Sequence, residues 1–92
     1  MTSRPMPTSA IPWACSLRVT DSAACLAAIE TGLAGLVAAG RLRHATVAHE
    51  HVAITFDAET RDEALRTAGE ILRELGARRV QVFGALPLAA AC

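Results

Sequence analysis

Apolar and polar residues alternate along the stretch from residue 42 to residue 57, whose sequence is LRHATVAHEHVAITFD. The alternation runs on either side of the polar triplet His49-Glu50-His51. A period of two is typical of a strand with one buried face. The stretch therefore predicts two half-buried strands joined by a tight turn.

The same alternation predicts one strand near each end of the chain. In the first, apolar residues take every second position: Trp13, Cys15, Leu17 and Val19. In the last, from Arg79 to Leu86, Val80 and Val82 share one parity, and Pro87 ends the strand.

A helix is predicted over residues 22–39, with Asp21 as its N-cap and Gly40 after its last turn. Gly32 and Gly35 lie inside it, and each indicates either close packing against a neighbour or simple tolerance. Apolar residues recur at steps of three and four and form the core-facing stripe: Leu26, Ile29, Leu33, Leu36 and Val37.

A second helix begins after the capping box from Thr60 to Glu63 and ends at Gly76. Its apolar stripe consists of Leu65, Ala68, Leu72 and Leu75, with Ala64 and Ile71 beside it. The resulting element order is β-α-β-β-α-β.

Right-handed crossovers place both helices of such a chain on one face of the sheet. We therefore predict an α+β domain over residues 12–87, a four-stranded antiparallel plait of the ferredoxin-like type with strand order 4-1-3-2. Residues 1–11 are interpreted as a flexible leader and residues 88–92 as a short apolar tail.

The face opposite the helices is expected to be bare. Phe83 is its one large apolar residue, so we expect a homodimer formed sheet to sheet or edge to edge. The interface residues predicted from parity are Phe83, Arg18, Gln81 and Thr55.

Composition narrows the function classes. The chain has nine arginines, no lysine and nine acidic residues, so no net field attracts nucleic acid or an anionic membrane. Stacking of RNA bases on the bare face would rest on Phe83 alone.

Three cysteines without CxxC spacing, together with no signal peptide, favour a reduced cytoplasmic protein. No nucleotide-binding pattern is present, and no cofactor is predicted.

The polar triplet is the one cluster that resembles a metal site. His49 and His51, with His44 nearby, have the residue types that zinc prefers, whereas a plain polar turn, at which side chains splay apart, is the favoured explanation. Histidine also titrates near neutral pH, so His44 or His51 is a candidate general base.

Cys25 lies in the first turn of a predicted helix, where the helix dipole lowers a thiol pKa. It is a candidate nucleophile or, more simply, a small packed side chain. Cys15 shares the core parity and is expected to be inert.

Arginines follow both predicted helices. Arg41 and Arg43 come after the first and Arg78 and Arg79 after the second. They complement the helix dipoles, and a small anion-binding patch is the alternative interpretation, because both helices are expected to end on one side of the plait.

Residues 13–86 resemble the ferredoxin-like superfold that ACT regulatory domains and dimeric α+β-barrel proteins share. The resemblance lies in the order of the helices and strands and in which alternate residues of each strand are apolar. The first loop, Thr20-Asp21-Ser22, lacks the glycine typical of ACT domains and the CxxC of heavy-metal-binding members. The resemblance implies a fold and no site residues.

The leading functional hypothesis is a non-enzymatic homo-oligomer that binds a small ligand or a protein partner. One alternative is a small dimeric barrel-type enzyme that uses His44 or His51 as its base. The other is an accessory subunit of a larger complex.

Overall fold

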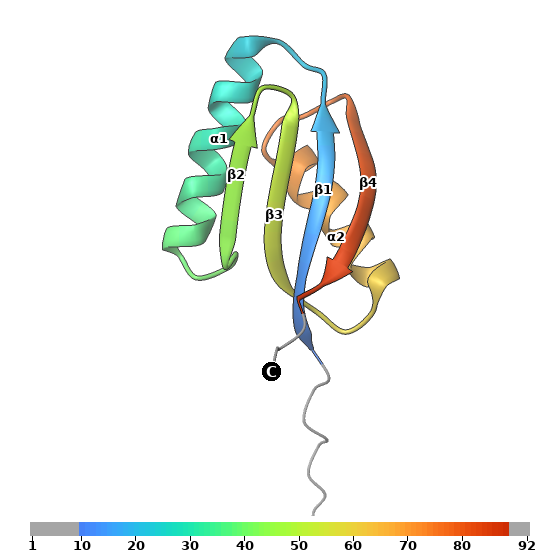
Figure 1. Cartoon of the computed structure of the whole chain (residues 1–92). Coiled ribbons are helices and arrows are strands. Elements are labelled where there is room, and N and C mark those ends of the chain that lie inside the picture. The colour runs from blue at the N-terminus through green and yellow to red at the C-terminus, as the bar shows by residue number, and fades with distance from the viewer. Residues whose placement is uncertain (1–9, 89–92) are drawn as a thin grey trace, which may run out of the picture.

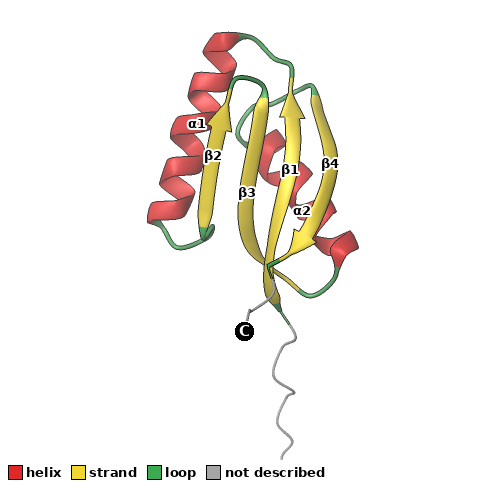
Figure 2. Ribbon diagram, viewed as in Figure 1, coloured by secondary structure: helices red, strands yellow, loops and turns green. Residues whose placement is uncertain are grey.

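A computed structural model of the protein describes residues 10–88. Its six elements follow the predicted order (Figures 1 and 2). They are β1 (Ile11–Val19), α1 (Ala23–Ala38), β2 (His44–Ala48), β3 (His51–Ala58), α2 (Arg61–Glu74) and β4 (Val80–Pro87).

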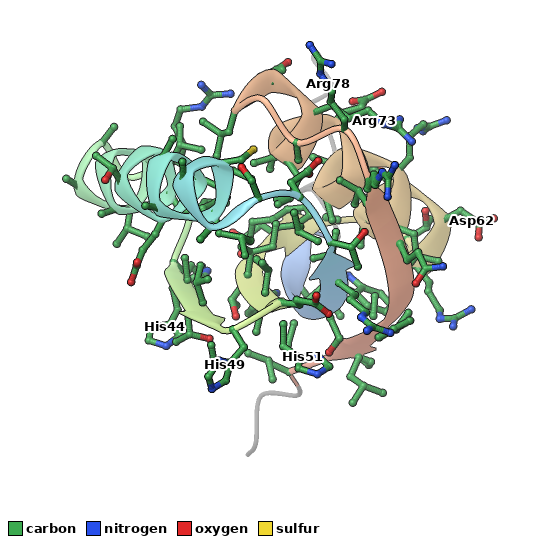
Figure 3. All side chains as sticks on the ribbon, turned by 90° about the horizontal axis from the view of Figure 1, so that it is seen from above. His44, His49, His51, Asp62, Arg73 and Arg78 are labelled. Atoms are coloured by element: carbon green, nitrogen blue, oxygen red, sulfur yellow. The ribbon has the colours of Figure 1, made fainter. Side chains whose placement is uncertain are left out.

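The four strands form one antiparallel sheet in the order β2-β3-β1-β4. The predicted α+β class and strand order are thereby confirmed, and the arrangement is compatible with a ferredoxin-like fold. Viewed from above, both helices lie on one side of the sheet (Figure 3). The other side is called the open face below.

The two ends of the sheet are named for the chain segments found there. At one end, called the entry end, the described chain enters at β1 and leaves at β4 (Figure 1). At the hairpin end, His49 and Glu50 join β2 to β3, and His49 adopts a left-handed backbone with φ 57°. The backbone N–H of Val19 donates to the Glu50 carbonyl at 2.8 Å, which ties β1 to this turn.

The core fills the space between the helices and the sheet. It draws alternate residues from β1 and β3, as the parity predicted, and the inward residues of α2. Its largest fully buried side chains are Leu17, Ile29, Leu33, Ile54, Leu72, Val19, Val52 and Cys15.

The predicted N-cap of α1 is wrong by one residue. Ser22 is the cap, and its hydroxyl accepts from the Cys25 N–H at 3.2 Å. Asp21 instead accepts from the backbone N–H groups of Arg78 and Arg79 at 3.0 and 3.2 Å. Either residue type can cap a helix, so the preference of Asp21 for the loop before β4 was not visible in the local pattern.

The other helix ends agree with the predictions. Thr60 caps α2 by accepting from the Glu63 N–H, and the Glu63 carboxylate reaches back to the N–H of Glu59. Gly40 and Gly76, with φ of 81° and 105°, each follow a helix whose last carbonyls accept from the next two N–H groups. Glycine is favoured at these two positions because the backbone there is left-handed, a conformation that residues with a Cβ rarely adopt.

The two helices run antiparallel, so they end at opposite ends of the sheet (Figure 1). Arg43 lies at the entry end, where its N–H donates to Thr55. Arg79 lies at the hairpin end, where its carbonyl accepts from Thr20. The predicted anion patch shared by Arg41, Arg43, Arg78 and Arg79 is therefore wrong, because the two pairs are separated by the length of the sheet.

Strand β4 contains a β-bulge. Val82 pairs with Leu17 and Gly84 with Ser16, so Phe83 is an extra residue without a partner on β1. Beyond the bulge the parity reverses, and Ala85 rather than Leu86 faces the core.

The boundaries of the domain differ slightly from the expectation. Ile11, assigned to the leader, is the first residue of β1, and the Leu88 N–H donates to the Pro12 carbonyl at 2.8 Å. Residues 1–9 of the predicted leader and residues 89–92 of the predicted tail lie outside the described residues.

Candidate functional site

The open face carries all four residues predicted for an interface. Arg18 pairs with Gln81 on one side and with His51 on the other. Thr55 lies beside Ala14, one strand further along the same face. Phe83 is 57% exposed in the bulge of β4.

The bulge adds a second large apolar side chain to this face. Leu86 is 71% exposed and lies opposite Ala14 of β1. We call Phe83, Leu86 and Ala14 the β4 patch. Side chains of this size are seldom left together in water, so the patch is the part of the open face best suited to binding.

Four charged groups on and beside the open face are paired with each other, whereas the Nη2 of Arg61 lies 4.0 Å from where a Cβ on Gly84 would be and has no ion pair with residues 10–88. Arg18 donates from Nε to Glu50 Oε1 at 2.9 Å, and its Nη2 lies 2.8 Å from the same oxygen. Arg43 donates to both carboxylate oxygens of Asp57, at 2.6 and 3.1 Å. The hydrogen bond from Arg43 lowers the pKa of Asp57, and the same bond raises the pKa of Arg43. Each pair is neutral, so a partner meets no unpaired charge from these four groups.

The histidines do not converge. His44 opens β2 opposite Thr55, whereas His51 opens β3 opposite Ala48. These two positions are four residues apart on β3, about 13 Å along the strand. All three histidines are exposed on the side away from the helices (Figure 3).

The predicted metal pair, His49 and His51, borders a shallow hollow at the hairpin end together with Asp21 and Glu50. Both carboxylates have other partners, since Asp21 holds the loop before β4 and Glu50 holds Arg18. Across the described residues, no group of three His, Cys, Asp or Glu side chains is placed to hold a metal ion.

The two described cysteines differ in surroundings. Cys15 is fully buried beneath α2, and burial raises the pKa of its thiol to about 11. Cys25 is half-buried, and its Sγ lies 3.6 Å from the Gly76 carbonyl at the end of α2. This contact packs the candidate nucleophile between the helices rather than against a histidine.

Sequence reasoning placed Phe83 on the open face but missed Leu86, because strict alternation assigned it to the core. The available signal was Gly84, since a glycine inside a strand often marks a bulge.

Comparisons of the chain with protein-family models, with curated proteins and with solved structures found no match. Within residues 10–88, neither helix combines the length and the apolar character needed to cross a membrane.

Proposed function

We propose that the protein is a binding domain that works as a homodimer, with the open faces of two copies packed against each other. The observation that carries this proposal is the β4 patch, in which Phe83 and Leu86 are 57% and 71% exposed on a face that neither helix covers. Burying two such side chains contributes roughly 1.5–3 kcal/mol each.

Charge also favours a second copy as the occupant. The groups on and beside the open face form two neutral ion pairs, Arg18 with Glu50 and Arg43 with Asp57. Two copies related by a two-fold axis therefore meet without like-charge repulsion from these four groups.

The size of the face is sufficient for a modest dimer. Four strands spaced about 4.8 Å apart, with a mean length of about 25 Å, cover roughly 500 Å² per copy. Two copies would bury roughly 1,000 Å², the lower limit for a specific interface. We therefore expect a dissociation constant in the micromolar range rather than an obligate dimer.

Light scattering during size-exclusion chromatography tests the proposal. The wild-type chain should have twice the mass of the 92-residue monomer at high micromolar concentration. Phe83→Asp should be monomeric, because the interface would have to bury a carboxylate.

The matched control is Ala27→Asp, which places the same charge on the exposed surface of α1, away from the open face. This variant should remain dimeric. A monomeric wild-type chain at these concentrations, or a dimer broken by Ala27→Asp and not by Phe83→Asp, would contradict the proposal.

A further inference from the structure

A cleft of about 590 Å³ opens between the two helices, on the side of the molecule opposite the open face. Leu36 of α1 forms one wall, and Thr67 and Ile71 of α2 form the other. Leu42 and Phe56 form the floor and are 3% and 5% exposed. A volume of this size is typical of a small-molecule site.

The two helices contact each other near the hairpin end, and the cleft opens beside this contact. There a Cβ on Gly32 would lie 2.6 Å from Leu75 Cδ2, and Cys25 contacts Gly76. One helical turn nearer the entry end, Leu36 and Ile71 both line the cleft instead of closing it. The apolar walls are thus held apart by the packing of the two backbones.

Two guanidinium groups lie at the entry end of the cleft. Arg43 uses Nε and Nη2 on Asp57, which leaves further N–H donors unused. Arg41 also lines the cleft and has no ion pair or side-chain hydrogen bond with the described residues. Asp57 lines the cleft at the same end, so this end has one net positive charge, and the unpaired Arg41 offers a planar set of donors suited to a carboxylate.

The opposite end of the cleft carries the reverse charge. Glu74 lines the cleft beside Leu75, near the point where the helices meet, and likewise lacks an ion pair with residues 10–88. A carboxylate is disfavoured there and favoured at Arg41, so an anion with an apolar chain has one preferred orientation. Its chain would lie between Leu36 and Ile71.

We propose that this cleft binds a small amphipathic carboxylate, with its head group at Arg41 and its apolar chain along Leu36, Ile71 and Phe56. The site uses no residue of the β4 patch. It therefore exists in the monomer as well as in the proposed dimer, and the two proposals can fail separately.

Calorimetric titration of the full chain with octanoate, below its micelle-forming concentration, tests the site. We expect saturable binding of one octanoate per chain, in wild-type protein and in Phe83→Asp alike. Binding should tighten by up to about fourfold for each methylene from hexanoate to octanoate, as expected for burial of the chain. Octylammonium, which has the same chain and the opposite charge, should bind at least tenfold more weakly.

Arg41→Gln should weaken octanoate binding about tenfold or more, because a charge-assisted hydrogen bond is lost. Arg73→Gln, the matched control, removes an exposed guanidinium on the helix side that does not line the cleft, and should change affinity less than twofold (Figure 3). Ile71→Trp should abolish binding by filling the cleft.

Arg41 is exposed, so its variant keeps the fold and the test remains decisive even if Ile71→Trp unfolds. Absence of saturable binding to wild-type protein would overturn the proposal. Equal affinity for octylammonium, or an Arg41→Gln variant that binds like wild type, would overturn it as well.

Discussion

The two helices are similar in length but present different surfaces to water. Most exposed residues of α2 are charged: Arg61, Asp62, Arg66, Glu70, Arg73 and Glu74. Most exposed residues of α1 are alanines, and Glu30 is its one charged residue. Helix α2 lies across β4, β1 and β3, whereas α1 lies mainly beside the edge strand β2 (Figure 1).

This difference shows what holds each helix in place. The charged face of α2 fixes its orientation, since every other rotation about its axis would bury a charge. Rotation of α1 costs far less desolvation, because half of its residues are alanine or glycine and Glu30 is its one charged residue. Its position depends on Ile29 and Leu33, its two buried residues, and on the close approach at Gly32.

The largest expected effect comes from removing one core leucine from each helix. Leu72→Ala in α2 should cost about 4 kcal/mol, because the cavity would open under a helix that packs on three strands. Leu33→Ala in α1 should cost about 2 kcal/mol, because a helix beside the sheet edge can shift to fill the space. Urea unfolding of both variants measures the two losses. A larger loss for Leu33→Ala would mean that α1 is fixed as firmly as α2.

The fold was accessible from the sequence because its signals are local and mutually consistent. Alternation in β1 and β3 has a strict period of two, and Thr60 with Glu63 marks the start of α2 by residue type alone. The bulge at Phe83 was harder, because one unpaired residue in β4 changes the side of every residue after it.

The site was less accessible, because it depends on contacts between residues far apart in sequence. Asp21 could have capped α1 on its own chemistry, and its bond to Arg78 is visible only in the fold. Arg41 and Glu74 are separated by 33 positions, and only the antiparallel helices place them at two ends of one cleft. The antiparallel directions of the helices also place Arg78 and Arg79 at the hairpin end of the sheet, away from Arg41.

An intermediate effect is expected from the two glycines of α1, which form a matched pair. Gly35→Ala should stabilise the protein by about 1 kcal/mol, since its Cβ meets open space and alanine favours the helix. Gly32→Ala gains the same propensity but places a Cβ 2.6 Å from Leu75 Cδ2. The displaced Leu75 side chain should cancel the gain or reverse it by about 1 kcal/mol.

Thermal unfolding of both alanine variants distinguishes a position that needs glycine from one that merely tolerates it. Equal stabilisation by the two substitutions would show that α1 and α2 are not in close contact at Leu75. The comparison of the two variants would then give no support to a cleft that is held open by packing between α1 and α2.

The smallest expected effect concerns the exit of α1, which the exposed pair of Arg43 and Asp57 fastens to the end of β3. The pKa of Asp57 is lowered in the folded state, so the folded chain releases this proton more readily than the unfolded chain. The pair therefore stabilises the fold fully above the unfolded-state pKa of about 3.9, and this contribution is lost as the pH falls through the lower folded-state value. Asp57→Asn should lower the melting temperature slightly near pH 7, where the ion pair contributes, and should match the wild type at acidic pH, so that the acid side of a plot of melting temperature against pH becomes flatter. Glu59→Gln is the control, since Glu59 is an exposed acid two residues away whose carboxylate pairs with no described residue. If both variants follow the wild-type curve, the exit of α1 is held by its backbone bond from Arg43 to Thr55 and not by the ion pair.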